Sequence, residues 1–281
     1  MPALLPPALK LSLDLLRCPV CRTHRLLAGP GTLRCPDGHC FDVARHGYAA
    51  LLTGSRATSG DDTAMVRARE RFLATGGYAP VRDTAVRLAA ADAPRRATVV
   101  DVGCGTGHYL SGVLDRLPAA RGLGLDTSVR ALRSAARAHT RAAAAAWDVF
   151  RPFPLAGGVA DVVLDVFAPR NPAEFHRVLR PTGRLLVVRP TGRHLAELRG
   201  RLPALVGVDP AKERRLHRAL DPFFETVRTE RVEYPLPLDR PRAGDLVRMT
   251  PSARHLGGVD VGGLVPERIT VSVLATVYRP R

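Results

Sequence analysis

Apolar residues recur in short blocks along the second half of the chain, separated by amphipathic stretches. From about residue 97 onward, blocks rich in Val and Leu alternate with segments whose apolar positions have a helical period. The blocks predict buried strands at 97–103, 123–126, 161–168 and 183–190. The segments between them predict helices at 108–117, 128–139 and 171–180. This alternation predicts an α/β fold with a parallel sheet covered on both faces.

Two further stretches belong to the same pattern. The alanine run at 142–146 stands where a third strand is expected, but alanine carries no strand signature, so that strand is placed only loosely. Near the C-terminus, residues 268–280 ("RITVSVLATVYRP") alternate as a final strand should. This segment is therefore expected to be the final strand of the chain.

The first part of the chain has a different character. Residues from about 14 to 54 show little hydrophobic periodicity and are too few for a core of their own, so a bound metal is expected to order them. A connector follows, loop-like at first and then a charged helix that ends at Gly76 and Gly77. We therefore expect three parts, at 1–54, 55–80 and 81–281.

Charge adds a constraint on partners. The formal net charge is +16, and arginine carries nearly all of it because Lys10 and Lys212 are the only lysines. A GC-rich genome accounts for arginine over lysine but not for the excess of cations, which suggests a polyanionic partner such as nucleic acid. No apolar run approaches the roughly 18 residues that span a bilayer, and the N-terminus lacks a signal-peptide pattern. We therefore expect no membrane association and a cytoplasmic location.

Reduced cysteines in such a location are candidates for metal ligands. Cys18 and Cys21 form C-x2-C, and Cys35 begins a second pair whose other member is His39 or Cys40. Three thiolates with one imidazole, or four thiolates, both suit tetrahedral zinc, and the spacing alone leaves the two sets open. The fifth cysteine, at position 104, lies far away and is expected to pack as a small side chain.

The stretch "VVDVGCGTGHYL" is the most informative in the chain. A buried strand carrying Asp101 leads into a loop with glycines at 103, 105 and 107 and then into a helix. Glycine allows a ligand to approach the backbone closely and accepts positive φ. His108 stands where the dinucleotide fingerprint G-x-G-x-x-G requires its last glycine, which argues against NAD.

The next strand ends at Asp126, whose carboxylate can accept hydrogen bonds from both hydroxyls of a ribose. The strand, the D-x-G-x-G-x-G loop and this acid together resemble the class I S-adenosylmethionine-dependent methyltransferases. That family has a Rossmann-like fold in which the loop backs the methionine and ribose portion of the cofactor. The resemblance implies cofactor contacts at Asp101, Gly103, Gly105, Gly107 and Asp126.

A narrower resemblance spans nearly the whole chain. It rests on the segments "CPVC", "CPDGHCFDVARHGYAALL", "MVRARERFLATGGYAPVRD", "VVDVGCGTGHY", "VFAPRNPAEFHRVLRPTGRLLVVRPTGRHLAEL" and "RMTP". In this order they resemble the 23S ribosomal RNA guanine-N1 methyltransferases of the RlmA and TlrB type, with the tylosin-resistance branch favoured. The resemblance implies a zinc-binding RNA-recognition module at 1–54 ahead of a class I methyltransferase domain at 81–281.

The resemblance also implies particular residues. The family's zinc ligands fall on Cys18, Cys21, Cys35 and His39, which leaves Cys40 surplus. Its cofactor contacts fall on Tyr78, Gly105, Thr106 and His194. Some relatives carry an acidic residue at the Thr106 position, so a backbone contact is expected there rather than a side-chain one. The family is also associated with homodimers.

Guanine N1 must lose a proton before or during methyl transfer, and a carboxylate, a histidine or water can take it. Asp165, at the end of the fourth expected strand, is the nearest carboxylate, with the backbone of Ala168–Pro169 as an alternative means of orienting the base. Because N1 is paired in a duplex, a hairpin loop with an unstacked nucleotide is the expected target. Phosphate contacts near the zinc site are expected from Arg17, Arg22, Arg25, Arg34 and Arg45.

Two other functions share parts of this pattern. A small-molecule methyltransferase of an antibiotic pathway would carry the same glycine loop, but it gives no reason for the zinc module or the charge. A zinc-containing RNA-binding protein with a vestigial methyltransferase fold would explain the charge. The intact acid and glycines of the loop argue against that second alternative.

Overall fold

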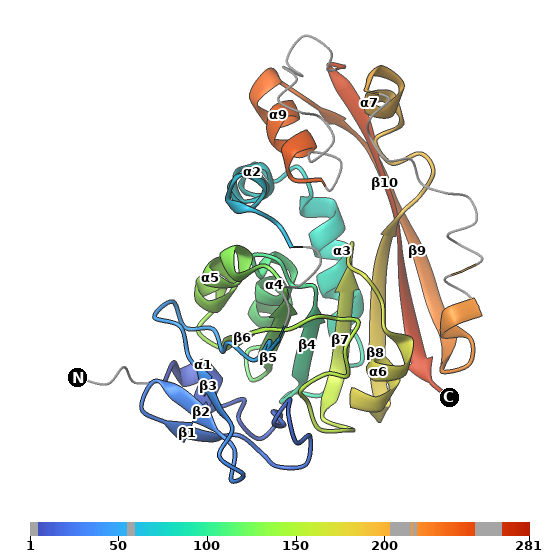
Figure 1. Ribbon diagram of the computed structural model, residues 1–281. Helices are drawn as coiled ribbons and strands as arrows, with labels where there is room; N and C mark the ends of the chain where they lie inside the picture. Colours follow the sequence, from blue (N-terminus) through green and yellow to red (C-terminus); the bar gives the residue numbers. More distant parts are fainter. Residues whose placement is uncertain (1–4, 55–59, 203–214, 216–217, 251–265) are drawn as a thin grey trace.

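A computed structural model describes residues 5–54, 60–202, 215, 218–250 and 266–281 of the chain. Its centre is a seven-stranded sheet in the order β6-β5-β4-β7-β8-β10-β9 (Figure 1). The strands span Thr98–Val102 (β4), Arg121–Asp126 (β5), Ala142–Ala146 (β6), Ala160–Val166 (β7), Leu179–Pro190 (β8), Phe224–Pro237 (β9) and Arg268–Pro280 (β10). The order reverses direction between β4 and β7, and ligands of such sheets bind beyond the strand ends at that point.

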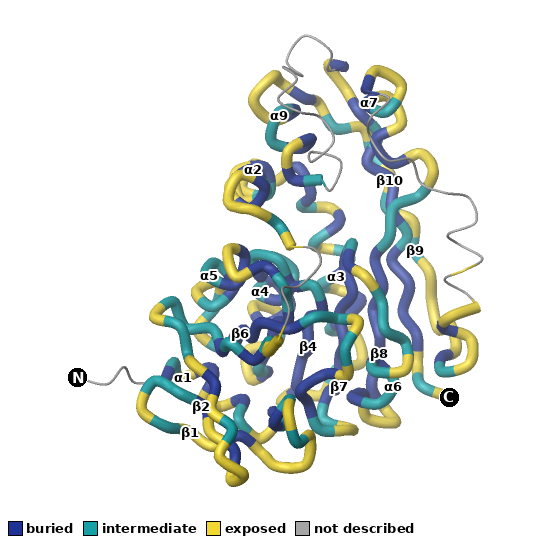
Figure 2. The backbone as a smooth tube through the Cα atoms, in the orientation of Figure 1, coloured by how far each residue is buried: buried dark blue, intermediate teal, exposed yellow. Residues whose placement is uncertain are grey.

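The sheet is mixed rather than wholly parallel. β6, β5, β4, β7 and β8 run parallel to one another, as predicted, whereas β10 runs antiparallel to both β8 and β9. β10 occupies residues 268–280 as expected. β9, which was not predicted, is exposed along most of its length (Figure 2). It carries many charged residues. An edge strand gains from charge because charged side chains discourage pairing with other chains.

The alanine run forms the buried strand β6. Ala143 and Ala145 pack toward the N-terminal part of the chain, and Ala144 and Ala146 pack toward the preceding helix, Val129–Ala138. The N–H of Ala49 donates to the carbonyl of Ala144 at 2.9 Å, and the N–H of Ala146 donates to the carbonyl of Ala49 at 2.8 Å. Small side chains allow this close approach on both sides, which outweighs the weak strand propensity of alanine.

Helices cover both faces of the sheet. α3 (Ala79–Ala90), α4 (His108–Arg116) and α5 (Val129–Ala138) pack on one face, and α6 (Pro172–Val178) packs on the other. α2 (Thr63–Ala74) lies beside α5 and α9 (Arg240–Arg248), while α7 (Ala196–Arg201) lies against β10. The helix expected in the connector is α2, and its chain turns at Gly76 with a φ of +74°.

The N-terminal part contains the short helix α1 (Pro7–Lys10) and a three-stranded antiparallel sheet. Its strands are β1 (Leu27–Gly29), β2 (Thr32–Arg34) and β3 (Cys40–Asp42). Buried side chains such as Leu16 and Phe41 belong to one apolar cluster with Val100 and Leu123 of the central sheet. The segment therefore has no separate core, as expected, and shares the core of one sheet face.

Parts of the predicted features lie outside the described residues. These are residues 1–4 of the N-terminal module, 55–59 of the connector, and 203–214, 216–217 and 251–265 of the predicted methyltransferase domain, which include Pro251 of the segment "RMTP". No helix among the described residues is both long enough and apolar enough to cross a bilayer.

Candidate active site and metal centre

The glycine loop follows β4 at the carboxyl edge of the sheet. All three glycines have positive φ: +73° at Gly103, +54° at Gly105 and +82° at Gly107. A Cβ on Gly103 would lie 2.5 Å from the Cβ of Ala168, and one on Gly107 would lie 2.9 Å from that of Ala138. Both the conformation and the packing therefore require glycine at the first and third positions.

Gly105 is different because it faces open space. The nearest atom to an added Cβ is Cδ of Arg69, at 3.9 Å. Its N–H donates to Oδ2 of Asp126 at 2.8 Å, and the N–H of Ser128 donates to Oδ1 at 2.7 Å. These bonds fix the carboxylate at the end of β5 and leave lone pairs for ribose hydroxyls. Thr106 is half-buried beside this glycine.

Asp101 lies in β4 below the loop and is only 2% exposed. Its Oδ2 has no hydrogen-bond partner among the described residues. Burial, together with the nearby carboxylates of Asp126 and Asp165, raises the pKa of Asp101 to about 8. A buried acceptor left unpaired is costly unless a ligand satisfies it. The positive charges of S-adenosylmethionine suit the carboxylates of this site. The space beside Gly105 leaves room for the cofactor to approach the backbone.

Tyr78, Phe167 and His194 form an aromatic cluster beside the glycine loop. Phe167 stacks on His194 with ring centroids 6.0 Å apart, and Tyr78 lies 6.0 Å from Phe167. The N–H of Ser272 donates to Nδ1 of His194, so the imidazole is neutral and its Nε2–H donates to the hydroxyl of Tyr78 at 3.2 Å. Burial lowers the pKa of His194 to about 4, which agrees with the neutral form.

The structure thus brings Tyr78 and His194 together from segments 116 residues apart. Sequence reasoning assigned no role to Phe167 itself, whose φ of +56° is strained for a residue with a bulky side chain. Its position directly after a buried strand at the switch point was the available signal. The pattern could not show that its ring stacks on His194.

Arg69 of α2 was also missed. It forms an ion pair with Asp61, with Nε and Oδ2 3.0 Å apart, and its Nη2 donates to the carbonyl of Met249. Its guanidinium lies close enough to Tyr78 and Asp126 to influence the pKa of both. Arg69 therefore places a cation beside the open face of the glycine loop. On a charged helix surrounded by other arginines, nothing in the sequence distinguished it.

Asp165 lies in β7 and is fully buried. Its Oδ1 is 3.2 Å from Nε of Arg170, in an ion pair. Side chains alternate across a strand, so Asp165 faces away from its neighbours Leu164 and Val166, which pack in the cluster that contains Tyr78. This position suits holding the turn after β7 in place. Its role as a general base stays a prediction.

Four side chains of the N-terminal module form a cluster whose potential ligand atoms all lie within 4.8 Å of one another: Cys18, Cys21, Cys35 and His39. Sγ of Cys18 lies 3.5 Å from Nδ1 of His39, and Sγ of Cys21 lies 3.5 Å from that of Cys35. Tetrahedral zinc with Zn–S bonds of about 2.3 Å places its ligand atoms about 3.8 Å apart, so the set fits the ion. Cys40 is exposed and lies outside the cluster.

The thiols of this cluster differ in acidity. Hydrogen bonds from Thr23 and the backbone of His24 lower the pKa of Cys21 to about 6, whereas burial raises the pKa of Cys35 to about 11. A thiol loses its proton when it coordinates a metal, and the lowered pKa of Cys21 makes that loss easier there than at Cys35. Protein ligands fill all four positions, so the site is structural rather than catalytic.

Known proteins share both halves of this architecture. Residues 16–56 match the zinc-ribbon family described as RlmA, N-terminal, and residues 99–183 match the family described as Methyltransferase domain. The chain is 45% identical to a putative 23S rRNA (guanine-N(1)-)-methyltransferase of Micromonospora griseorubida, over 94% of this chain and 97% of the relative. It is 46% identical to the 23S rRNA (guanine(748)-N(1))-methyltransferase of Streptomyces fradiae, over 94% of this chain and 96% of the relative.

This chain belongs to the 23S rRNA (guanine-N1)-methyltransferase family. Membership confirms the family predicted from the sequence, an S-adenosylmethionine-dependent methyltransferase that carries a zinc ribbon. Among solved structures, the YcgJ protein of Bacillus subtilis aligns with a TM-score of 0.50 at 14% identity, covering 71% of this chain and 97% of that protein. That likeness supports the methyltransferase fold alone.

Proposed function

We propose that this enzyme transfers the methyl group of S-adenosylmethionine to N1 of a guanine in a hairpin loop of 23S rRNA. The observation that carries the proposal is the identity of 45–46% over 94% of the chain to two proteins named for guanine-N1 methylation. The intact glycine loop with its unpaired acid Asp101 supports an active enzyme rather than a vestigial fold.

S-adenosylmethionine supplies an electrophilic methyl group on a sulfonium, and the protein contributes mainly positioning. The backbone at Gly105 and Thr106 provides the surface for the ribose and methionine portion, and Asp126 binds the ribose hydroxyls. Asp101 pairs with positive charge on the cofactor. Tyr78 and His194, linked by their hydrogen bond, form the wall beside it.

The target base is proposed to enter beside Phe167, which follows β7 at the switch point and whose ring is part of the aromatic cluster. An unpaired loop nucleotide can be stacked there without breaking a duplex. His194 is neutral and both of its nitrogens are engaged, so it is not the acceptor of the N1 proton. Water or Asp165 remains for that role.

RNA docking is assigned to the zinc module. Of its five arginines, Arg22, Arg25, Arg34 and Arg45 are exposed and Arg17 is half-buried. Since the module shares its core with the central sheet, a phosphate held there is fixed relative to the glycine loop. This rigidity supports a recognition role for the zinc ribbon.

The test is methyl transfer from labelled S-adenosylmethionine to unmodified 23S rRNA, with a macrolide such as tylosin as a competing acceptor. Label in the RNA alone supports the proposal. Label in the macrolide alone would favour a small-molecule methyltransferase. Failure to bind the cofactor in calorimetry would favour a vestigial fold.

We further propose a contribution to macrolide resistance of the tylosin type. It follows from the family resemblance to the tylosin-resistance branch. Expression in a macrolide-sensitive host should raise the inhibitory concentration of tylosin, and the Asp101→Asn variant should not. Unchanged sensitivity despite complete RNA methylation would point to a housekeeping role.

Homodimerisation is proposed on the same family basis. One chain has a mass of 30.3 kDa. Light scattering of the zinc-loaded protein at micromolar concentration should give twice that mass. A mass of one chain would refute the dimer.

A further inference from the structure

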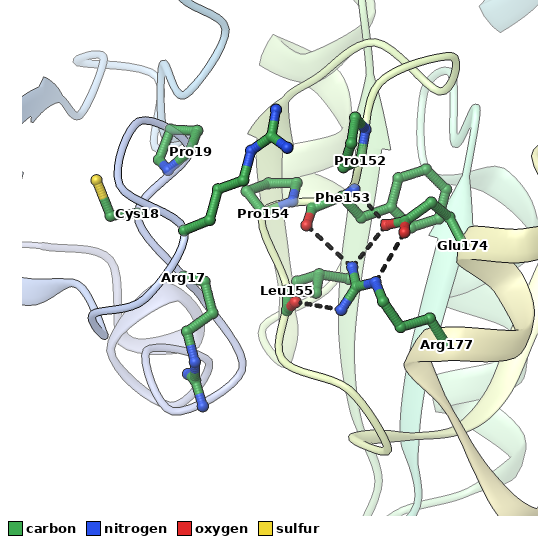
Figure 3. Close-up of a pocket in the computed structure, with 10 residues that line it drawn as sticks. Arg17, Cys18, Pro19, Pro152, Phe153, Pro154, Leu155, Glu174 and Arg177 are labelled. Carbon is green, nitrogen blue, oxygen red and sulfur yellow. Dashed lines mark hydrogen bonds and ion pairs between the residues drawn. The ribbon is translucent and has the colours of Figure 1, made fainter.

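A small pocket lies where the zinc module meets the loop between β6 and β7 (Figure 3). Its volume is about 280 Å³, and apolar side chains form much of its lining: Pro19, Pro152, Phe153, Pro154 and Leu155. The backbone joins the two sides, because the N–H of Arg17 donates to the carbonyl of Pro154 at 2.9 Å. Proline and aromatic rings present flat surfaces, and the volume suits a group the size of one nucleobase.

Two of the pocket's cations already have partners. Arg177 forms an ion pair with Glu174 and also donates to the carbonyls of Phe153 and Leu155. Arg17 donates to the carbonyls of Asp14 and Leu16, and its guanidinium points away from Pro154 in Figure 3. Neither guanidinium is available as a principal contact for a phosphate.

Arg22 is the third cation of the lining, and it is exposed. No described acidic side chain forms an ion pair with it. Its N–H donates to the carbonyl of Cys18 at 2.8 Å, which closes the turn around the zinc ligands. This turn gives Arg22 a φ of +61°, in the left-handed region where glycine is the unstrained choice. Arg22 is thus strained at a position where glycine would form the same turn without strain.

A second feature lies on the same loop. Phe150 comes two residues before Pro152, and 66% of its surface is exposed. RNA-binding proteins use exposed aromatic rings to stack unpaired bases. The loop that lines the pocket therefore also carries an exposed aromatic ring, and no described acidic side chain pairs with Arg22 of that pocket.

We propose that this pocket is an RNA subsite that takes one unpaired nucleotide, with its phosphate on Arg22 and its base against the proline-lined wall. The proposal rests on the proposed function, since it assigns a place on the enzyme to part of the RNA substrate. Backbone strain at Arg22 is retained because its guanidinium contributes to binding.

The test compares Arg22→Gly with Arg95→Gly in the full-length, zinc-loaded protein. Arg95 is exposed, lies in the turn before β4 and has no positive φ, so it controls for the loss of one charge. Affinity is measured for a single-stranded RNA oligonucleotide and for a duplex of equal length, across a range of salt concentrations. Melting temperature and zinc content are measured in parallel.

Arg22→Gly should weaken single-strand binding about tenfold and lower the salt slope by about 1, with less than a twofold change for the duplex. Its melting temperature should stay level or rise by about 2 °C because strain is relieved, while Arg95→Gly should change binding less than twofold. Phe150→Ala should weaken only single-strand binding.

Equal binding by Arg22→Gly and Arg95→Gly would overturn the subsite. Loss of zinc from Arg22→Gly would overturn it as well, because it would show that the arginine serves the module's own structure. The wild-type protein is assayed for methyl transfer to 23S rRNA in the same experiment. Failure of that assay would refute the proposed function instead, so the two failures are distinguishable.

Discussion

At the scale of single residues, the strained backbone positions among the described residues lie beside the candidate cofactor site and the zinc-ligand cluster. Among the described residues, three that are not glycine have positive φ: Arg22, Phe167 and Leu195. Phe167 stacks on His194, Leu195 follows that histidine directly, and Arg22 follows a zinc ligand. Each such conformation costs about 1–3 kcal/mol and persists only where the surroundings enforce it. A sequence pattern does not reveal it, because none of these residue types favours left-handed backbone.

Asp101 should release its proton when the cofactor binds. Its pKa is raised to about 8, so the free enzyme is mostly protonated there at pH 7, and positive charge on the cofactor favours the carboxylate. Calorimetry at pH 7 in buffers of different ionisation enthalpy should detect release of close to one proton. Cofactor affinity should rise with pH up to about 8 and level off above it.

The Asp101→Asn variant is the control for this effect. It should bind the cofactor more weakly and release no proton. Proton release that persists in Asp101→Asn would assign the titration to another group. A wild-type affinity that does not change with pH would contradict the pairing of Asp101 with cofactor charge.

Tyr78→Phe should destabilise the protein even without cofactor. The substitution removes the acceptor of the His194 Nε2–H and leaves that donor buried, at a cost of about 1–3 kcal/mol in the free energy of unfolding. Urea denaturation measures the difference. Tyr109→Phe is the matched control, because the Tyr109 hydroxyl is buried without a hydrogen-bond partner among the described residues, and its removal should cost little. Equal losses in both variants would contradict the proposed bond.

At the scale of elements, the sequence predicted five strands of the central sheet because their apolar blocks are buried on both faces. It located β6 only loosely, since its alanines are selected by close packing rather than by strand propensity. β9 was missed because exposure at the sheet edge fills it with Glu, Arg and Thr. The pairing of Tyr78 with His194 and the orientation of Asp165 depend on tertiary contacts, which no local pattern encodes.

Zinc binding should depend on His39 and not on Cys40. His39 belongs to the four-residue cluster, whereas Cys40 is exposed on β3. His39→Ala should lower the zinc content of the purified protein well below one ion per chain, and Cys40→Ser should leave it unchanged. Elemental analysis decides between them, and the reverse result would assign the fourth ligand to Cys40.

Zinc removal should destabilise both parts of the chain together. Apolar side chains of the module and of the central sheet belong to one buried cluster, so loosening the module exposes the sheet face. A strong chelator should lower the temperature of a single unfolding transition in calorimetry. Two separate transitions, with that of the methyltransferase part unchanged, would show that the module is an independent unit.

At the scale of the whole molecule, charge, fold and metal point to one activity. A basic surface attracts RNA, the zinc ribbon is fixed to the sheet by a shared core, and the carboxyl edge of the sheet presents the glycine loop and the aromatic cluster. The net charge of +16 predicts that binding to 23S rRNA weakens steeply as salt is raised. Charge and fold alone do not select the methylated atom.

Mapping the modified nucleotide shows directly whether this enzyme methylates N1 of a guanine in a hairpin loop. Unmodified 23S rRNA is incubated with the zinc-loaded enzyme and S-adenosylmethionine and then copied by reverse transcriptase, which stops at a guanine methylated on N1 because that atom is needed for pairing. We expect one new stop at a guanine in a hairpin loop, present with the wild-type enzyme and absent with Asp101→Asn. Methylated RNA without such a stop, or no methylated RNA at all, would contradict it.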